Sequence, residues 1–372
     1  MAATKVSSPK PACPDTTTFR TFCLPRIEAS ATIQLSSQFR GNMRRHLILA
    51  AIFATVPAAA QQTSDPLPRQ ASQYAVVHGW PTLPQGEILG SAAGVDVDSH
   101  GRVFVFHRAG RTWQEPLPTS LIPRPTIVVF DGASGQMLRQ WGAGIFAMPH
   151  GLTIDSHDNV WVTDVSLNQV FKFSPSGELL MTIGERAVAG NDERHFNRPT
   201  DIAVLPDGSF YVSDGYRNTR VAYFAADGGF LSQWGRPGNG PGEFNVPHAI
   251  KVDAQGRVYV ADRENDRVQV FTAKGQFISE WRSPRMGRPY SLALIDNGLA
   301  AVADGGEQPA QAPYRSGMAL VTRSGQVVST FGRFGNYDGQ FLMAHDVAAD
   351  ALGNLYVVDI AGQRVQTFRA KH

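Results

Sequence analysis

A short unit recurs six times from Gly94 onward, and this repetition constrains the fold more than any other feature of the sequence. Each copy begins with a turn residue and continues with alternating apolar positions, which is a β-strand pattern. The six copies read "HGRVFVFH", "HDNVWVTD", "DGSFYVSD", "QGRVYVAD", "NGLAAVAD" and "LGNLYVVD". A third alternating stretch such as "DRVQVF" follows most copies, and a fourth often ends in Trp-Gly or Phe-Gly. Four strands per unit at this period predict an all-β, six-bladed β-propeller.

The ends of the repeat array indicate how the ring closes. The last unit stops at "VQTFRAKH" and lacks its fourth strand, whereas residues 74–81, "YAVVHGWP", precede the first unit. We expect this N-terminal segment to complete the last blade, which removes an unpaired strand edge. The propeller is therefore predicted to span residues 74–372. The 36 glycines and 24 prolines agree with many turns and no long helix.

The sequence before the repeats has the layout of a targeting segment. Residues 43–60, "MRRHLILAAIFATVPAAA", place two arginines before an apolar run and a small-x-small site, as in a secretory signal peptide. We interpret residues 1–42 as an upstream extension or leader and residues 61–73 as a linker. An organelle-targeting leader or an N-terminal anchor is the alternative. The signal peptide predicts export to the periplasm or the medium.

The cysteines and charges narrow the chemistry further. The only cysteines, Cys13 and Cys23, lie before the predicted cleavage site, so the mature chain would have neither disulfides nor thiolate chemistry. The net charge is +2, with no basic stripe and no charge block. We therefore expect no nucleic-acid partner, no membrane association of the mature form, and a monomer.

Several repeated features are expected to be structural. The aspartate that ends most copies should accept turn hydrogen bonds. The Trp and Phe residues at the ends of the fourth strands should pack between blades. The glycine-rich "GRPGNGPGEF" lacks the Gly-Lys-Ser/Thr ending of a phosphate loop and is interpreted as a connection between blades.

Three histidines occur at one phase of the repeat. The position fourteen residues before the end of each copy is occupied by Ala93, His150, Thr200, His248, Tyr290 and His345. Alternate blades of a six-bladed ring lie about 120° apart, and the inner strand lines the central channel. The three imidazoles should therefore converge on the axis. Three imidazoles with an open fourth position are typical of catalytic zinc, although copper, nickel and iron also accept imidazole. The alternative is three unrelated polar residues in a wet channel.

Three loops that follow second strands carry further candidates. "FHRAGRTW" presents Arg108, "SDGYRNTR" presents Tyr216, and "ADRENDR" presents Arg263. Two arginines near a metal indicate an anionic substrate, most simply a carboxylate. A tyrosine of ordinary pKa near 10 is a poor base at neutral pH, but a nearby dication and guanidinium groups favour the phenolate. Tyr216 is then a candidate proton acceptor, unless these loops are merely turns held by salt bridges.

These residues lie in stretches that resemble a known family. The blades are similar to NHL-repeat propellers and, more narrowly, residues 74–368 resemble the catalytic domain of peptidyl-α-hydroxyglycine α-amidating lyase. The motifs are "VFVFHR", "MPHGLTID", "NVWVTDVSLNQVFKF", "HFNRPTDIAV", "VSDGYRNTRV", "FNVPHAIKVD", "VADRENDRVQVF" and "MAHDV".

The resemblance implies roles for individual positions. It implies zinc at the three histidines, catalytic Arg108 and Tyr216, and substrate contacts from Arg263 and Met343. It also implies a structural calcium, which the residues alone do not indicate. Its ligands would be the backbone carbonyls of Val95 and Leu152 and the carboxylate of Asp346.

The chain departs from the family pattern at several positions. Asn197 and Arg217 stand where one family disulfide would form, and Tyr259 and Val270 stand where the other would. Ala344 replaces a usual proline. No oxygenase partner domain is apparent in this sequence, so the natural substrate stays open.

The sequence as a whole predicts a zinc-dependent lyase that cleaves an N-acyl-α-hydroxyglycine, or a similar carbinolamide with a carboxylate, to an amide and glyoxylate. Zinc would act as the Lewis acid, Tyr216 would take the hydroxyl proton, and the two arginines would stabilise negative charge. The alternative is an exported NHL-type module that binds a metal or ligand without catalysis. A metallohydrolase or lactonase propeller is a third possibility, but such propellers commonly bind calcium through carboxylate and asparagine ligands, so the histidine trio counts against it.

Overall fold

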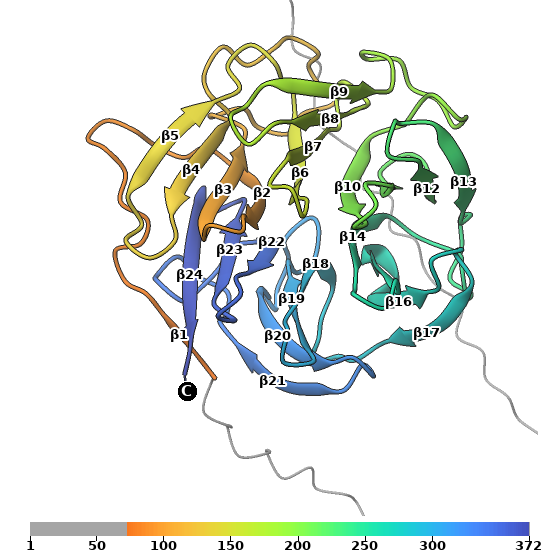
Figure 1. Cartoon of the computed structure of the whole chain (residues 1–372). Helices are drawn as coiled ribbons and strands as arrows, with labels where there is room; N and C mark the ends of the chain where they lie inside the picture. Colours follow the sequence, from red (N-terminus) through yellow and green to blue (C-terminus); the bar gives the residue numbers. More distant parts are fainter. Residues whose placement is uncertain (1–72, 372) are drawn as a thin grey trace, which may run out of the picture. The chain divides into compact units, whose positions relative to one another are not determined.

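The computed structural model describes residues 73–371, which form six four-stranded antiparallel sheets arranged around a common axis (Figure 1). This arrangement confirms the six-bladed β-propeller. Within the described residues the only helical element is a single turn, Arg263–Asn265, and no helix is long and apolar enough to cross a membrane. The predicted extension, signal peptide and nearly all of the linker lie outside the described residues.

Each blade runs from an inner to an outer strand. Blade 1 contains β2 (Ala92–Val97), β3 (Arg102–His107), β4 (Ile127–Asp131) and β5 (Met137–Trp141). Blade 2 contains β6 (Pro149–Ile154), β7 (Val160–Asp164), β8 (Gln169–Phe173) and β9 (Leu179–Ile183). Blade 3 contains β10 (Pro199–Val204), β11 (Phe210–Asp214), β12 (Arg220–Phe224) and β13 (Phe230–Trp234).

The second half of the ring repeats this order. Blade 4 contains β14 (Pro247–Val252), β15 (Val258–Asp262), β16 (Arg267–Phe271) and β17 (Phe277–Trp281). Blade 5 contains β18 (Pro289–Leu294), β19 (Leu299–Asp304), β20 (Gly317–Thr322) and β21 (Val327–Phe331). Blade 6 contains β22 (Ala344–Ala349), β23 (Leu355–Asp359), β24 (Arg364–Ala370) and, from the other end of the chain, β1 (Tyr74–Val76).

The N-terminal strand closes the ring, as predicted. β1 pairs antiparallel with β24, with Tyr74 opposite Ala370 and Val76 opposite Phe368. The strand is shorter than the expected segment 74–81, because a turn follows Val76. Beyond that turn the Trp80 ring packs against Phe130 of blade 1 and Tyr356 of blade 6, so this segment also fills the seam between the two blades.

The inner strand of every blade carries an irregularity at the same point. In β14, Pro247 pairs with Asp262 and Ala249 pairs with Ala261, so His248 is left without a partner in the ladder. The register shifts in the same way in the other five inner strands. A bulge of this kind re-aims the unpaired side chain. In five blades the unpaired residue is the one that the repeat phase singled out, and in β6 Gly151 is unpaired beside His150.

The residue that ends each second strand holds the neighbouring turns, as expected. The carboxylate of Asp164 accepts hydrogen bonds from the backbone N–H groups of Ala147, Met148, Ser166 and Leu167 at 2.6–2.9 Å. In blade 1 a histidine takes over this task, because Nδ1 of His107 accepts from the N–H groups of Gly90 and Ala109. The predicted structural role of these positions is confirmed.

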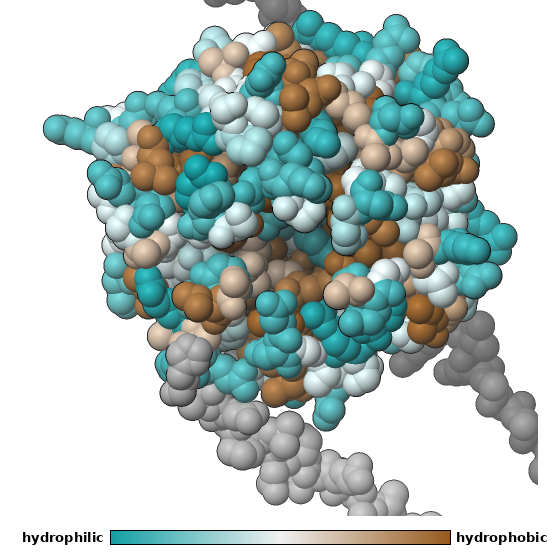
Figure 2. Space-filling view, in the orientation of Figure 1, coloured by the Kyte–Doolittle hydropathy of each residue, from teal (hydrophilic) through white to brown (hydrophobic). Residues whose placement is uncertain are grey.

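The hydrophobic core lies largely between the blades. The indole of Trp141 on β5 contacts Phe173 of the next blade with ring centroids 5.0 Å apart, and Trp281 on β17 packs in a cluster that includes Leu292 and Val302 of blade 5. The glycine-rich segment 235–244 connects β13 to β14, as expected. On the face shown in Figure 2, hydrophilic residues predominate and hydrophobic residues are scattered among them.

Candidate active site

The three histidines meet on the channel axis. His150, His248 and His345 come from β6, β14 and β22, each at the bulge of its strand. Their ring centroids lie 4.8–4.9 Å apart, and the side chains are only 2–4 % exposed. The predicted convergence of the three imidazoles is therefore present in the structure.

The hydrogen bonds of the three rings fix which nitrogen faces the centre. Nδ1 of each ring lies 2.7 Å from a backbone carbonyl oxygen, that of Thr200, Tyr290 or Ala93. A carbonyl only accepts, so each Nδ1 carries the proton and each neutral ring keeps its lone pair on Nε2. The three carbonyls belong to the bulge residues of the intervening blades. The ring of six equivalent positions thus alternates an imidazole with the carbonyl that orients it.

Burial keeps these imidazoles neutral. It lowers the pKa of His345 to about 3 and holds the pKa of His150 and His248 well below the ordinary value, with repulsion from Arg108, Arg263 and the neighbouring histidines adding to the effect. Neutral imidazoles with inward lone pairs are what a zinc ion requires, and an orienting hydrogen bond on the other ring nitrogen is usual for metal-bound histidine. The donor set fits zinc.

The hydroxyl of Tyr216 lies close to two of these nitrogens. Its hydroxyl oxygen is 2.9 Å from Nε2 of His150 and 3.0 Å from Nε2 of His248. The residue follows the end of β11, in the loop that the sequence singled out. A group bound at the three histidines would therefore lie within reach of the Tyr216 oxygen.

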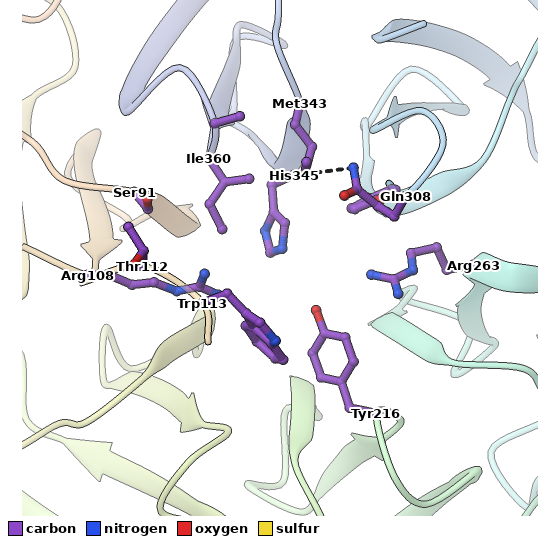
Figure 3. A pocket seen from close by; sticks show the side chains of 12 residues that line it. Ser91, Arg108, Thr112, Trp113, Tyr216, Arg263, Gln308, Met343, His345 and Ile360 are labelled. Carbon is purple, nitrogen blue, oxygen red and sulfur yellow. Dashed lines mark hydrogen bonds between the residues drawn. The ribbon is translucent and has the colours of Figure 1, made fainter. Parts of the chain in front are cut away.

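The two candidate arginines approach from different sides of the same cavity, as Figure 3 shows. Arg108 is buried and donates from Nε to the carbonyl oxygen of Pro149 at 3.0 Å; burial lowers its pKa to about 10, which leaves it charged at neutral pH. The guanidinium carbon of Arg263 lies 5.4 Å from the Tyr216 ring centre and 4.9 Å from the Tyr290 ring centre. Burial by itself would lower the pKa of Arg263, but its attraction to Tyr216, Tyr290 and Glu264 raises it.

The cavity has a volume of about 390 Å³ and is lined by both polar and apolar side chains. His345, Tyr216 and the two charged arginines, Arg108 and Arg263, form its polar part. Met343, the predicted substrate contact, lines the cavity, and its sulfur accepts a hydrogen bond of 3.5 Å from Gln308. This volume is in the range of sites for small ligands.

The predicted calcium ligands lie together deeper in the channel. Oδ2 of Asp346 accepts from the N–H of Val95 at 2.9 Å, and Oδ1 accepts from Ser291 at 2.6 Å. In an antiparallel strand the N–H and C=O of one residue point to the same side, so the Val95 carbonyl also faces the channel. Leu152 has the same orientation, because Ile154, two residues further along β6, donates its N–H to Asp96 of the neighbouring blade 1.

The charges around Asp346 are unbalanced. Asp96, Asp201 and Asp346 share a single ammonium, that of Lys251, which lies 2.9 Å from Asp201. Burial raises the pKa of Asp346 to about 7 and that of Asp96 to about 6, against the lowering effect of Lys251. Oδ1 of Asp201 is buried and has no hydrogen-bond partner among residues 73–371. Excess negative charge and oxygen donors fit a hard cation such as calcium.

The sequence reasoning missed several residues of the site. Trp113 and Gln308 line the cavity from loops that do not repeat, and the hydroxyl of Tyr290 is buried there with no hydrogen-bond partner in the described part of the chain. Trp113 stands only five residues after Arg108, and Tyr290 occupies the histidine phase, so both were visible but carried no specific signal. Arg217, at a family disulfide position, lies 3.9 Å from Glu115 and donates its backbone N–H to Asn197.

Family models and known proteins agree with this architecture. An NHL-repeat model matches residues 146–173, and a model described as a 6-bladed beta-propeller matches residues 189–296. A solved structure of a streptogramin B lyase has a TM-score of 0.53 and 13 % identity, and covers 80 % of this chain and 98 % of that one. At that identity the likeness shows the fold alone.

Curated relatives are considerably more similar in sequence. The chain is 34 % identical to peptidyl-glycine alpha-amidating monooxygenase A of Xenopus laevis over 76 % of its length, and it spans about a third of that protein, 32 %. It is also 34 % identical to peptidyl-alpha-hydroxyglycine alpha-amidating lyase 2 of Drosophila melanogaster, over 83 % of this chain and 78 % of the relative. The chain therefore belongs to the peptidyl-α-hydroxyglycine α-amidating lyase family.

Proposed function

We propose that the protein is a zinc-dependent lyase that cleaves an N-acyl-α-hydroxyglycine to the corresponding amide and glyoxylate. The observation that carries the proposal is the set of three neutral imidazoles with inward Nε2 lone pairs, 2.9–3.0 Å from the hydroxyl of Tyr216 for two of them. Family membership supports the reaction class. A zinc ion held by His150, His248 and His345 would supply Lewis acidity at the substrate hydroxyl.

Residues of this chain would accept the proton of the α-hydroxyl group and stabilise the negative charge that develops in the reaction. In the phenolate form, the Tyr216 oxygen removes the proton of the α-hydroxyl group as the carbonyl of glyoxylate forms. The electron pair of the C–N bond passes to the amide nitrogen, which takes up a proton and leaves as the amide. Arg108 and Arg263 line the same cavity as Tyr216 and would stabilise negative charge on the reacting groups, and Arg263 would hold the substrate carboxylate.

The calcium, the location and the oligomeric state are part of the same proposal. A structural calcium at Asp346, Val95 and Leu152 is supported by the excess of buried carboxylates; the midpoint of thermal unfolding would then fall when a calcium chelator is added. Export is supported by the layout of residues 43–60. Mass spectrometry of the exported protein should find a mature N-terminus near Gln61, and light scattering should find a monomer.

The first test is glyoxylate release from α-hydroxyhippurate by the zinc-loaded protein. Release should require zinc and should be lost, together with tight zinc binding, in a His248→Ala variant. His157→Ala is the matched control. That histidine is exposed and lies in the turn between β6 and β7, at the opposite end of β6 from His150. Folded, zinc-loaded protein that releases no glyoxylate would refute the proposed reaction.

The alternative function is a module that binds a metal and a ligand without catalysis. The apolar lining of the cavity is compatible with a binding role. In that case the zinc-loaded protein would bind hippurate, an unreactive analogue, but would release no glyoxylate from its hydroxylated form.

A further inference from the structure

One long connection lies over the site. Residues 108–126, here called the strap, join β3 to β4 and form the longest link between strands of one blade in the described part of the chain. The strap leaves blade 1 at Arg108 and reaches the loops of other blades. Ser166 of blade 2 donates to the carbonyl of Pro118 at 2.6 Å, and Ile122 donates its N–H to the carbonyl of Phe146 at 2.7 Å.

The strap is also fixed to blade 3 by an ion pair. Both guanidinium NH₂ groups of Arg198, immediately before β10, donate to the carboxylate of Glu115, at 2.7 and 2.9 Å. Arg217, in the loop that carries Tyr216, adds a second positive charge 3.9 Å away. A two-pronged arginine–carboxylate pair fixes orientation as well as distance. It therefore holds this part of the strap close to the Tyr216 loop.

The side chain that this attachment positions is Trp113. The centre of the Trp113 ring lies 5.1 Å from the centre of the Tyr216 ring. The guanidinium carbons of Arg108 and Arg198 lie 5.4 and 6.0 Å from the Trp113 ring centre. The indole lines the cavity and is 38 % exposed, although large aromatic side chains are usually more deeply buried. In Figure 3 Trp113 lies beside Tyr216, while Ile360 and Met343 lie on the other side of the cavity.

This arrangement orders the substrate along the cavity. The groups that would hold the hydroxyl and the carboxylate form the polar part of the cavity, so the N-acyl group must extend along its apolar walls. We propose that Trp113 is a specificity-determining residue that selects substrates with an aromatic or large apolar group on the acyl side, and that Glu115 is a positioning residue for it. The inference rests on the proposed lyase function, because that function sets the orientation of the substrate.

The test compares two substrates that differ only in the acyl group, α-hydroxyhippurate and N-acetyl-α-hydroxyglycine. The unaltered protein should have a kcat/KM about tenfold higher for the benzoyl substrate, since one aromatic contact is worth about that factor. Trp113→Ala should bring the ratio near one by raising KM for the benzoyl substrate, and Trp113→Phe should keep most of the preference. Equal values for both substrates in the unaltered protein, or an equal loss on both in Trp113→Ala, would overturn the proposal.

The role of Glu115 has its own readout. Glu115→Gln should lower the benzoyl preference through KM with kcat little changed, and should expose the strap to limited proteolysis, whereas Glu115→Asp should restore both properties in part. A Glu115→Gln variant with an unchanged substrate ratio would refute the positioning role.

A binding experiment tests the specificity role of Trp113 independently of the lyase function. Calorimetry with hippurate and N-acetylglycine, neither of which can react, should give the same preference and the same dependence on Trp113. If no glyoxylate is released but hippurate still binds more tightly in a Trp113-dependent way, the lyase proposal fails and the specificity role stands. Equal affinity for the two analogues would refute the specificity role.

Discussion

At the scale of single residues, the site depends on the different use of the two nitrogens in each histidine. Nδ1 donates to a carbonyl of the next blade, which leaves Nε2 for the centre. The sequence could predict that His150, His248 and His345 converge, because each lies the same number of residues before the end of its blade's second strand. It could not predict the tautomers, since these are set by carbonyl groups that every residue type has. Trp113 escaped prediction because its loop has no counterpart in the other blades.

Tyr216 offers the most direct test at this scale. Replacing it with phenylalanine removes the oxygen that lies 2.9–3.0 Å from two Nε2 atoms but leaves the nitrogens in place. We expect turnover to fall by about 10²-fold or more, as on loss of a general base, while zinc stoichiometry is retained. Glyoxylate assays and metal analysis on the same preparation measure both. Tyr314→Phe, at an exposed tyrosine, is the control; turnover equal to that control would remove Tyr216 from the mechanism.

At the scale of elements, the bulge in each inner strand explains how equivalent positions of the repeat come together in one site. It leaves one residue out of the ladder in five blades and two, His150 and Gly151, in β6, and in blades 2, 4 and 6 it directs a histidine to the axis. The unpaired residues are of five types: alanine, histidine, glycine, threonine and tyrosine. No residue type therefore marks the bulge. The strands were predictable from the alternation of apolar and polar residues. The bulge near the start of each inner strand was not predictable, because no residue type identifies it.

Gly151 tests how closely the bulges pack. A Cβ at this position would overlap the carbonyl oxygen of Thr200, which orients His150, and would lie 2.9 Å from Cα of Asp201. We expect Gly151→Ala to lower the free energy of unfolding by about 1–3 kcal/mol and zinc affinity by about tenfold or more. Denaturant titration and competition with a zinc chelator measure these effects. Gly229→Ala is the control, because a Cβ there meets only the end of the Asp227 side chain. Equal effects of the two substitutions would refute this account of the bulge.

At the scale of the whole molecule, the site exists only because the ring is closed. The histidines come from blades 2, 4 and 6, and the carbonyl that orients His345 belongs to Ala93 of blade 1. The contact between blades 6 and 1 therefore carries part of the site as well as part of the core. Closure was predictable from the missing fourth strand. The length of β1 was not predictable, because the chain turns after Val76 and the apolar residues beyond pack between blades 1 and 6 instead of pairing with β24.

Tyr74 links this closure to stability. It is buried on β1, its ring stacks on Phe331 of blade 5 with centroids 5.3 Å apart, and its hydroxyl donates to the carbonyl of Gly353 at 2.9 Å. We expect Tyr74→Ala to lower the free energy of unfolding by about 3 kcal/mol. We also expect a shallower dependence on urea, since an opened array of blades can unfold stepwise instead of as one unit. Leu352→Ala, an exposed position in the same blade, should leave both the midpoint and the slope of the urea curve unchanged. If Tyr74→Ala shifts the midpoint but keeps the slope of the unaltered protein, the N-terminal strand contributes packing but does not make the ring cooperative.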